Sequence, residues 1–215
     1  MRELHVYSGS AGPAPAVYLN LHDGDGSDVL ARCGELGVGA FSLIAVGGLD
    51  WNAELSPWPA PALIPGEDFA GRADGYLAEL TEEILPAAER LLPAPPTFRA
   101  LAGYSLAGLF ALYALYRTDR FSRAASVSGS LWYPGFEVFA RERSTAGLPE
   151  RVYLSLGGRE SRSSDPRLAS NLERTAALRA HFAAQGIRTL FEENPGGHFR
   201  DPDLRTAKAI RWLLQ

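Results

Sequence analysis

The sequence has almost no cysteine and no long hydrophobic run. Cys33 is the one cysteine among 215 residues, which excludes an internal disulfide bond and a zinc site built from several thiolates. No segment reaches the ~20 apolar residues that a membrane-spanning helix needs. The stretch MRELHVYSGS also lacks the apolar run that follows the basic residue of a signal peptide. We therefore expect a cytoplasmic protein without a membrane partner.

Charge of one sign is lacking as well. The 21 basic and 25 acidic residues give a net charge of -4 and form no block that would mark a basic or acidic patch, so nucleic acid is not an expected partner. With 46% hydrophobic residues the chain can cover a sizeable core. Nothing repeats and no linker divides the chain, so we expect one domain over residues 1–215. The sequence predicts no particular oligomeric state.

Short runs rich in Val, Ile, Leu, Tyr and Phe alternate with segments of helical period. This alternation is typical of an α/β fold with a mostly parallel central sheet and helices on both faces. A helix is predicted after the second strand, with Ser27 as its cap and Cys33 on its apolar face. Seven strands are predicted, over residues 3–7, 16–21, 40–46, 98–102, 123–128, 151–156 and 187–192.

Two segments between the third and fourth predicted strands differ in kind. Residues 49–69 are rich in proline, contain two tryptophans and show little periodicity, which predicts a long loop. Residues 72–91 carry apolar side chains at helical spacing. They predict a helix that Pro86 must kink or interrupt, because proline has no backbone N–H to donate.

A single serine, Ser105, stands inside the apolar run LAGYSLAGL. The preceding FRALAGY suits a strand, and the following LAGLFALYALY is apolar at every non-glycine position, so that helix must be covered on all sides. Gly103 and Gly108 leave room for a sharp turn from strand to helix. A serine on such a turn points its hydroxyl out of the sheet's C-terminal edge. The amide of Leu106 then faces the place where an attacked carbonyl develops negative charge.

The match to the nucleophile-elbow pattern G-x-S-x-G is incomplete. Ala107 takes the place of the second glycine, which arrives one position late at Gly108. A serine that merely caps a buried helix is the alternative interpretation.

A serine hydroxyl becomes a nucleophile when a base removes its proton. Among the four histidines, His198 lies in the glycine-rich NPGGHFRDP, downstream of the serine as the order Ser, acid, His of hydrolases requires. We expect it to be the base. His22 and Asp23 have no third ligand at a recognisable spacing, so neither a metal nor a cofactor is expected.

Two carboxylates compete to orient that histidine. Glu160 closes GGRE directly after the strand VYLSLGG, where a hydrolase acid belongs. Asp165 precedes Pro166, an arrangement typical of a helix start, and the same pair recurs at Asp201 and Pro202. We favour Glu160 as the acid, interpret both aspartates as helix caps, and keep Asp165 as the alternative acid.

Several pieces of the chain, taken in order, resemble the Putative esterase family of the α/β-hydrolase superfamily, whose relatives include siderophore trilactone esterases and esterase D-like hydrolases. This resemblance implies an α/β-hydrolase fold and a serine ester hydrolase with Ser105, His198 and Glu160 in the catalytic positions. It also implies a second oxyanion donor in HDGDG, from the backbone of Asp23 or Gly24. The pieces are PAVYLNLHDGDG, WNAELSPWPAP, GEDFAGRADGYLAEL, GYSLAGLFALYAL, VSGSLW, LSLGGRE and GGHFRDP.

Aromatic residues around the predicted site indicate a pocket for an acyl or aryl group. The candidate substrate-binding residues are Tyr104, Trp132, Tyr133, Trp51 and Arg72. The chain has no spare length for a separate lid domain. The expected partner is a small-molecule ester or lactone, with a catecholate siderophore trilactone as one candidate. An acyltransferase and an inactive ligand-binding protein on the same fold stay open as alternatives.

Overall fold

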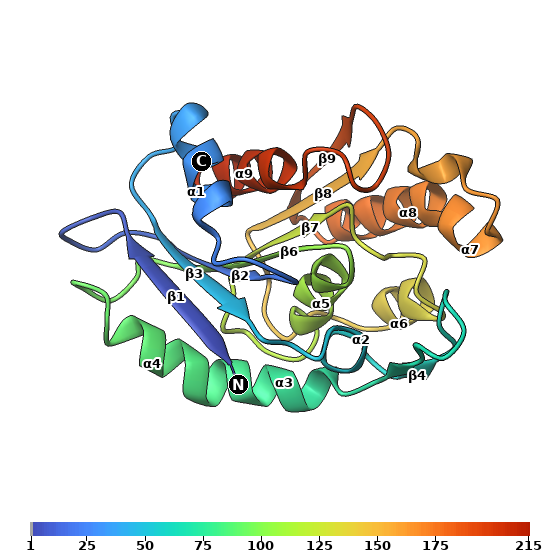
Figure 1. Ribbon diagram of the computed structural model, residues 1–215, viewed down its shortest axis with the longest axis horizontal. Helices are drawn as coiled ribbons and strands as arrows, with labels where there is room; N and C mark the ends of the chain where they lie inside the picture. Colours follow the sequence, from blue (N-terminus) through green and yellow to red (C-terminus); the bar gives the residue numbers. More distant parts are fainter. Residues whose placement is uncertain (1) are drawn as a thin grey trace.

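The computed structural model describes residues 2–215, so the first residue of the expected domain lies outside the described residues. Its centre is a seven-stranded sheet (Figure 1). The strand order is β1-β3-β2-β6-β7-β8-β9, in which β1 runs antiparallel to β3 and the other neighbours are parallel. The bounds are β1 (Glu3–Ser8), β2 (Ala16–Asn20), β3 (Ser42–Gly47), β6 (Arg99–Tyr104), β7 (Arg123–Val127), β8 (Arg151–Gly157) and β9 (Arg188–Asn194).

The predicted α/β fold with a mostly parallel sheet is confirmed, and each of the seven strands lies within two residues of its predicted bounds. Helices cover both faces of the sheet (Figure 1). Because side chains alternate along a strand, Val17 and Leu19 of β2 pack toward one face and Tyr18 toward the other. The first face is covered by α1 (Ser27–Glu35) and α9 (Pro202–Leu213), which contact each other.

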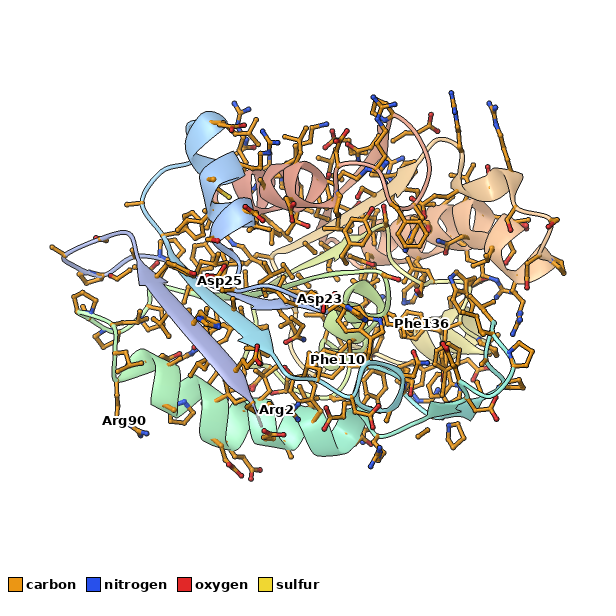
Figure 2. The ribbon with its side chains drawn as sticks, in the orientation of Figure 1. Arg2, Asp23, Asp25, Arg90, Phe110 and Phe136 are labelled. Atoms are coloured by element: carbon orange, nitrogen blue, oxygen red, sulfur yellow. The ribbon has the colours of Figure 1, made fainter. Side chains whose placement is uncertain are left out.

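The second face is covered by the remaining long helices and holds the larger hydrophobic cluster. All nine residues of α5 (Leu106–Ala114) are buried, as its apolar sequence predicts. Phe110 of α5 and Phe136 of α6 (Phe136–Arg141) are fully buried on this side (Figure 2). The other elements are α3 (Ala73–Glu79), α4 (Leu85–Glu89), α7 (Pro166–Ala169), α8 (Asn171–Ala184) and the 3₁₀ helix η2 (Glu160–Arg162).

The predicted helix over 72–91 is not a regular α-helix near Pro86. The helix is split into α3 and α4 by the π-helical η1 (Leu80–Ile84), which ends two residues before the proline. A π turn shifts the hydrogen-bond pattern by one residue, and such turns occur where the regular ladder is interrupted. The predicted interruption at Pro86 is therefore confirmed.

Two local predictions are wrong. The segment 49–69 is not a plain loop, because it contains α2 (Trp51–Glu54) and a short hairpin of β4 (Pro59–Ala60) and β5 (Phe69–Ala70). Ser27 is not the cap of α1 but its first residue. The amide of Ser27 donates to the carboxylate of Asp25, so the side-chain acceptor at the start of α1 comes from Asp25 and not from Ser27. No helix in residues 2–215 has the length and apolarity to cross a membrane.

Candidate active site

Ser105 lies at the turn between the end of β6 and the start of α5. Its backbone adopts φ 58° and ψ -120°, a conformation that non-glycine residues rarely adopt and that stores strain at functional sites. Its amide donates to the carbonyl of Val127, and its carbonyl accepts from the amides of Gly108 and Leu109. The Ser105 side chain makes no capping hydrogen bond with the helix. Helix capping therefore does not explain the serine.

The glycines around the turn are required by contact distances. A Cβ atom at Gly103 would lie 2.4 Å from the backbone of Ala107, and one at Gly108 would lie 2.9 Å from the carbonyl oxygen of Gly103. Neither position has room for a side chain. The methyl group of Ala107 fits beside Gly103 because that residue has no Cβ. This explains how the turn tolerates alanine where the usual pattern has glycine.

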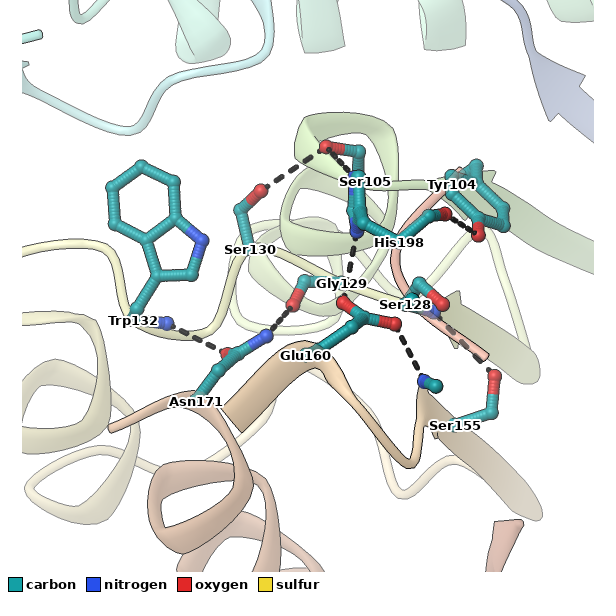
Figure 3. Close-up of polar contacts among 12 residues, drawn as sticks. Tyr104, Ser105, Ser128, Gly129, Ser130, Trp132, Ser155, Glu160, Asn171 and His198 are labelled. Carbon is teal, nitrogen blue, oxygen red and sulfur yellow. Dashed lines mark hydrogen bonds and ion pairs between the residues drawn. The ribbon is translucent and has the colours of Figure 1, made fainter. Parts of the chain in front are cut away.

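Ser105, His198 and Glu160 form a continuous chain of hydrogen bonds (Figure 3). The His198 Nε2 atom lies 3.1 Å from the Ser105 Oγ atom. On the other side of the ring, Nδ1 lies 2.8 Å from the Glu160 Oε2 atom. Ser105 follows β6, Glu160 follows β8 and His198 follows β9. Parallel strands bring their C-terminal ends to one edge of the sheet, which is how residues distant in sequence meet there.

Asp165, the alternative acid, is occupied elsewhere. Its carboxylate accepts a hydrogen bond from the Arg167 amide at 2.8 Å and so caps α7, as its place before Pro166 predicts. The same prediction is wrong for Asp201, which makes no side-chain cap at α9. Its backbone is left-handed, at φ 50° and ψ 50°, whereas a capping side chain needs an extended backbone.

Glu160 is held by donors on both carboxylate oxygens. Its side chain is 7% exposed, and Oε1 accepts from the Gly157 amide at 2.5 Å and from Arg205 at 3.3 Å. Burial by itself raises the pKa of this carboxyl, but the hydrogen bonds from His198 and Gly157 outweigh it and lower the pKa below its ordinary value. Glu160 is therefore ionised at neutral pH and ready to accept from the histidine.

Arg205 of α9 is a member of the site that sequence reasoning missed. Its side chain is 2% exposed, and its donors reach five oxygens. They are the Glu160 carboxylate at 3.3 Å, the hydroxyls of Tyr104 at 3.2 Å and Ser128 at 2.9 Å, and the carbonyls of Pro195 at 2.8 Å and Gly197 at 2.9 Å. The sequence did contain a signal for Arg205, because this arginine is a charged residue on the buried face of α9. The residues buried with it include Thr206, Ala209, Ile210 and Leu213.

Tyr104 lies beneath the histidine loop and lines neither cavity at the serine. Its hydroxyl donates to the carbonyl oxygen of His198 and accepts from Arg205. Burial raises the pKa of this phenol, so it keeps its proton and can donate. The interpretation of Tyr104 as a substrate contact is therefore corrected: it holds the His198 backbone in place.

Two cavities meet at Ser105. The larger, of about 440 Å³, includes His198, Glu160, Arg159, Arg162 and Phe199 in its lining. The smaller, of about 160 Å³, includes Leu106 and residues of the 51–69 segment. Five of these are apolar and two are polar: Trp51, Ala62, Leu63, Ile64 and Phe69, and Asn52 and Glu67. Trp132 lines both cavities, so two of the five predicted substrate-binding residues, Trp51 and Trp132, reach the serine's surroundings.

The structure places the other two candidates away from these cavities. Tyr133 is fully buried, and its hydroxyl donates to the carbonyl of Trp58. Arg72 is paired with Asp50 at 2.7 Å. Neither residue lines a cavity at Ser105, so both predictions of substrate contact are corrected. Aromatic character and charge near a motif do not reveal which way a side chain points.

The segment after β7 adds contacts that the sequence did not single out. The Ser130 hydroxyl lies 3.3 Å from the Ser105 hydroxyl, and the Ser130 amide donates to the Ser105 carbonyl. Asn171 is buried and joins the Gly129 carbonyl to the Trp132 amide (Figure 3). These bonds fix the segment VSGSLW against the turn at Ser105.

The predicted oxyanion donors follow two neighbouring strands, β6 and β2. Leu106 is the first residue of α5, where helix geometry leaves amides without an intrahelical acceptor. Asp23, which is labelled in Figure 2, and Gly24 follow β2, the strand hydrogen-bonded to β6. The Asp23 carboxylate contacts the ring of His22, which packs edge-on against Trp51. Within residues 2–215, the His, Cys, Asp and Glu side chains gather into no group of three that could hold a metal ion.

Comparison with known proteins identifies the family of this chain. Residues 15–202 match the family model described as Putative esterase. The chain belongs to this family. As a member it is an esterase of the α/β-hydrolase type. It is 29% identical over 193 residues to the uncharacterized protein YbbA of Bacillus subtilis, covering 84% of this chain and 76% of that protein.

Solved structures share the fold. An IroE-like serine hydrolase from Shewanella oneidensis superposes with a TM-score of 0.80 at 19% identity, over 99% of this chain and 75% of that one. The siderophore hydrolase EstA from Aspergillus nidulans gives 0.76 at 22% identity, over 99% of this chain and 89% of that one. At these sequence identities, the structural similarity establishes the fold of this esterase but not its substrate.

Proposed function

We propose that this esterase is a serine carboxylic-ester hydrolase that works through an acyl-enzyme on Ser105. The observation that carries the proposal is the hydrogen-bonded chain from Ser105 through His198 to Glu160, with distances of 3.1 and 2.8 Å. A nucleophile, a base and a group that orients the base are the three parts that activate a serine hydroxyl.

Each residue has a defined role in the proposed reaction. His198 takes the Ser105 proton as Oγ attacks the ester carbonyl carbon, and Glu160 holds the ring and stabilises its charged form. The developing oxyanion is held by the amide of Leu106 and by an amide of Asp23 or Gly24. His198 then gives the proton to the departing alcohol, and water, activated by the same histidine, releases the acid from the serine.

The proposed substrate is a small-molecule ester or lactone. A cavity of about 440 Å³ next to the hydroxyl falls within the size range of small-molecule sites. Since EstA of Aspergillus nidulans is a siderophore hydrolase, a siderophore lactone such as a catecholate trilactone belongs among the substrates to be tried, beside short p-nitrophenyl esters.

Hydrolysis of that panel by the wild type and Ser105→Ala tests the proposal. We expect the substitution to lower kcat by ~10⁶, the cost of losing a nucleophilic serine in comparable enzymes. The matched control is Ser130→Ala, which removes a hydroxyl 3.3 Å away and should cost less than about tenfold, the scale of one hydrogen bond. A Ser105→Ala protein as active as the control would refute the proposal. Transfer of the acyl group to an added alcohol in preference to water would assign an acyltransferase instead.

A further inference from the structure

The two cavities at Ser105 differ in which part of the catalytic apparatus they contain. His198 and Glu160 line the larger cavity, whereas Leu106, whose amide is the proposed oxyanion donor, lines the smaller one. Four residues line both cavities: Leu63, Ser105, Ser130 and Trp132. An ester bound at Ser105 must therefore place its two halves in unlike surroundings.

The proton path decides which half goes where. When the bond between the acyl carbon and the alcohol oxygen breaks, that oxygen takes the proton that His198 received from Ser105, so it must lie within hydrogen-bond reach of Nε2. The alcohol half then extends into the cavity that His198 lines. The acyl half, whose oxygen faces the Leu106 amide, extends into the smaller cavity.

The smaller cavity suits a compact apolar acyl group. Its volume is about 160 Å³, and most of its lining is apolar, although the polar Asn52 and Glu67 also contribute to it. The large apolar side chains are those of Trp51, Leu63, Ile64, Phe69, Leu106 and Trp132. An apolar protein cavity of about 150 Å³ accommodates benzene. A benzoyl group, or an unbranched acyl chain of about the same volume, therefore fills this space.

The larger cavity suits an alcohol that carries negative charge. Arg159 and Arg162 line it on the side of η2, both are exposed, and within the described residues neither takes part in an ion pair. Other arginines near the site are already engaged: Arg205 with Glu160 and Arg167 with Asp165. Because the net charge of the chain is -4, attraction for an anion has to come from such local groups.

We propose that the protein prefers esters in which a short or benzoyl-sized apolar acid is joined to a larger, negatively charged alcohol. This preference rests on the proposed serine hydrolase function. The reaction consumes one water and yields the free acid and the alcohol, with Ser105 and His198 restored. A catecholate trilactone, whose acyl half is larger than benzoyl, is then expected to be a slower substrate than a short ester of an anionic alcohol.

The charge preference is tested with a matched pair of butyrate esters, one of 4-hydroxyphenylacetate and one of the neutral 4-hydroxyphenylacetamide. We expect kcat/KM to be about tenfold higher for the anionic ester, as two exposed ion pairs worth about threefold each would give. In Arg159→Gln/Arg162→Gln this ratio should fall to about one. The matched control is Arg90→Gln, an exposed arginine at the far end of α4 (Figure 2), which should keep the wild-type ratio.

The acyl preference is tested with p-nitrophenyl esters of increasing chain length. Ile64→Ala enlarges the smaller cavity and should shift the preferred acyl chain to a longer one, whereas Leu168→Ala enlarges only the larger cavity and should not. A wild-type protein that hydrolyses both members of the ester pair equally well, or that keeps its charge ratio in the double variant, overturns the inference. So does an acyl-length profile moved by Leu168→Ala and not by Ile64→Ala. A folded protein that hydrolyses none of these esters contradicts the proposed function itself.

Discussion

The residues around the larger cavity at Ser105 form two groups that are built in opposite ways. In the first group, Glu160 is hydrogen-bonded to His198 and to the buried Arg205, which also donates to the carbonyl of Gly197 next to the histidine. In the second group, Arg159 and Phe199 stand exposed at the cavity wall, with Phe199 at 91%. A misplacement of about 1 Å can cost a catalytic group 10²-fold in rate, whereas a substrate can adapt to exposed walls. The comparison indicates that substitutions in the hydrogen-bonded group should change kcat, and those in the exposed group should change substrate preference.

The largest expected effect in the hydrogen-bonded group is that of His198→Ala. Without the base, the Ser105 hydroxyl keeps its proton, and kcat should fall by ~10⁶, as it does when either the serine or the histidine of such a pair is removed. Steady-state kinetics on a short p-nitrophenyl ester measure the loss. Since His198 is partly exposed, the variant should fold, and circular dichroism checks this. A loss of less than tenfold in a folded variant would remove His198 from the mechanism.

Glu160→Gln should have the next largest effect. The amide keeps the shape of the carboxylate but removes the charge that stabilises the imidazolium and fixes its tautomer, and the comparable change in a serine protease costs ~10⁴ in kcat. The matched control is Asp165→Asn, which alters the alternative acid, placed at the start of α7. If Asp165→Asn lowered kcat more than Glu160→Gln, the assignment of the acid would be reversed.

Arg205→Lys should lower kcat by about 10²-fold with little change in KM. Lysine keeps the positive charge but cannot reach Glu160, Tyr104 and the Pro195 and Gly197 carbonyls together, because it lacks the planar guanidinium fork. Kinetics and thermal unfolding should be measured on the same preparation. A fall in unfolding temperature with unchanged kcat would show that Arg205 stabilises α9 without positioning the site.

Tyr104→Phe should lower kcat several-fold and the free energy of unfolding by about 1 kcal/mol, the value of one hydrogen bond. The phenol donates to the His198 carbonyl, so its loss loosens the loop that carries the base. Tyr116→Phe is the matched control, because the Tyr116 hydroxyl is buried without a partner among the described residues. Its removal should leave kcat unchanged and stability equal or higher. Equal kcat in both variants would contradict the role given to Tyr104.

The pKa of Glu160 predicts a smaller effect of pH on stability. Because the carboxyl has a lower pKa in the folded protein than its ordinary value of 4.5, the unfolded chain binds the proton more readily. The resulting stabilisation is present above pH 4.5 and is lost as the pH falls through the folded pKa. Unfolding by urea at a series of pH values should give a shallower acid dependence in Glu160→Gln than in the wild type. Parallel curves would show that this carboxyl is not stabilised by folding.

The sequence was sufficient for the sheet and for the sharp turn that carries Ser105, because both depend on local patterns. The strands show as apolar runs, and the turn at Ser105 shows as glycines that steric contact demands. The role of Arg205 could not be predicted, because its hydrogen-bond partners come from loops distant in sequence. Tyr104, Tyr133 and Arg72 were interpreted by proximity to a motif, but the direction of a side chain depends on packing that one sequence does not display. Ser27 was misassigned for a similar reason, since Asp25 satisfies the helix start instead.

Covalent labelling with a fluorophosphonate, followed by peptide mass spectrometry, tests the central claim most directly. The account predicts one adduct on Ser105 in the wild type, much slower labelling in His198→Ala and no adduct in Ser105→Ala. A folded wild-type protein that stays unlabelled, or that carries its adduct on another serine such as Ser130, would contradict it.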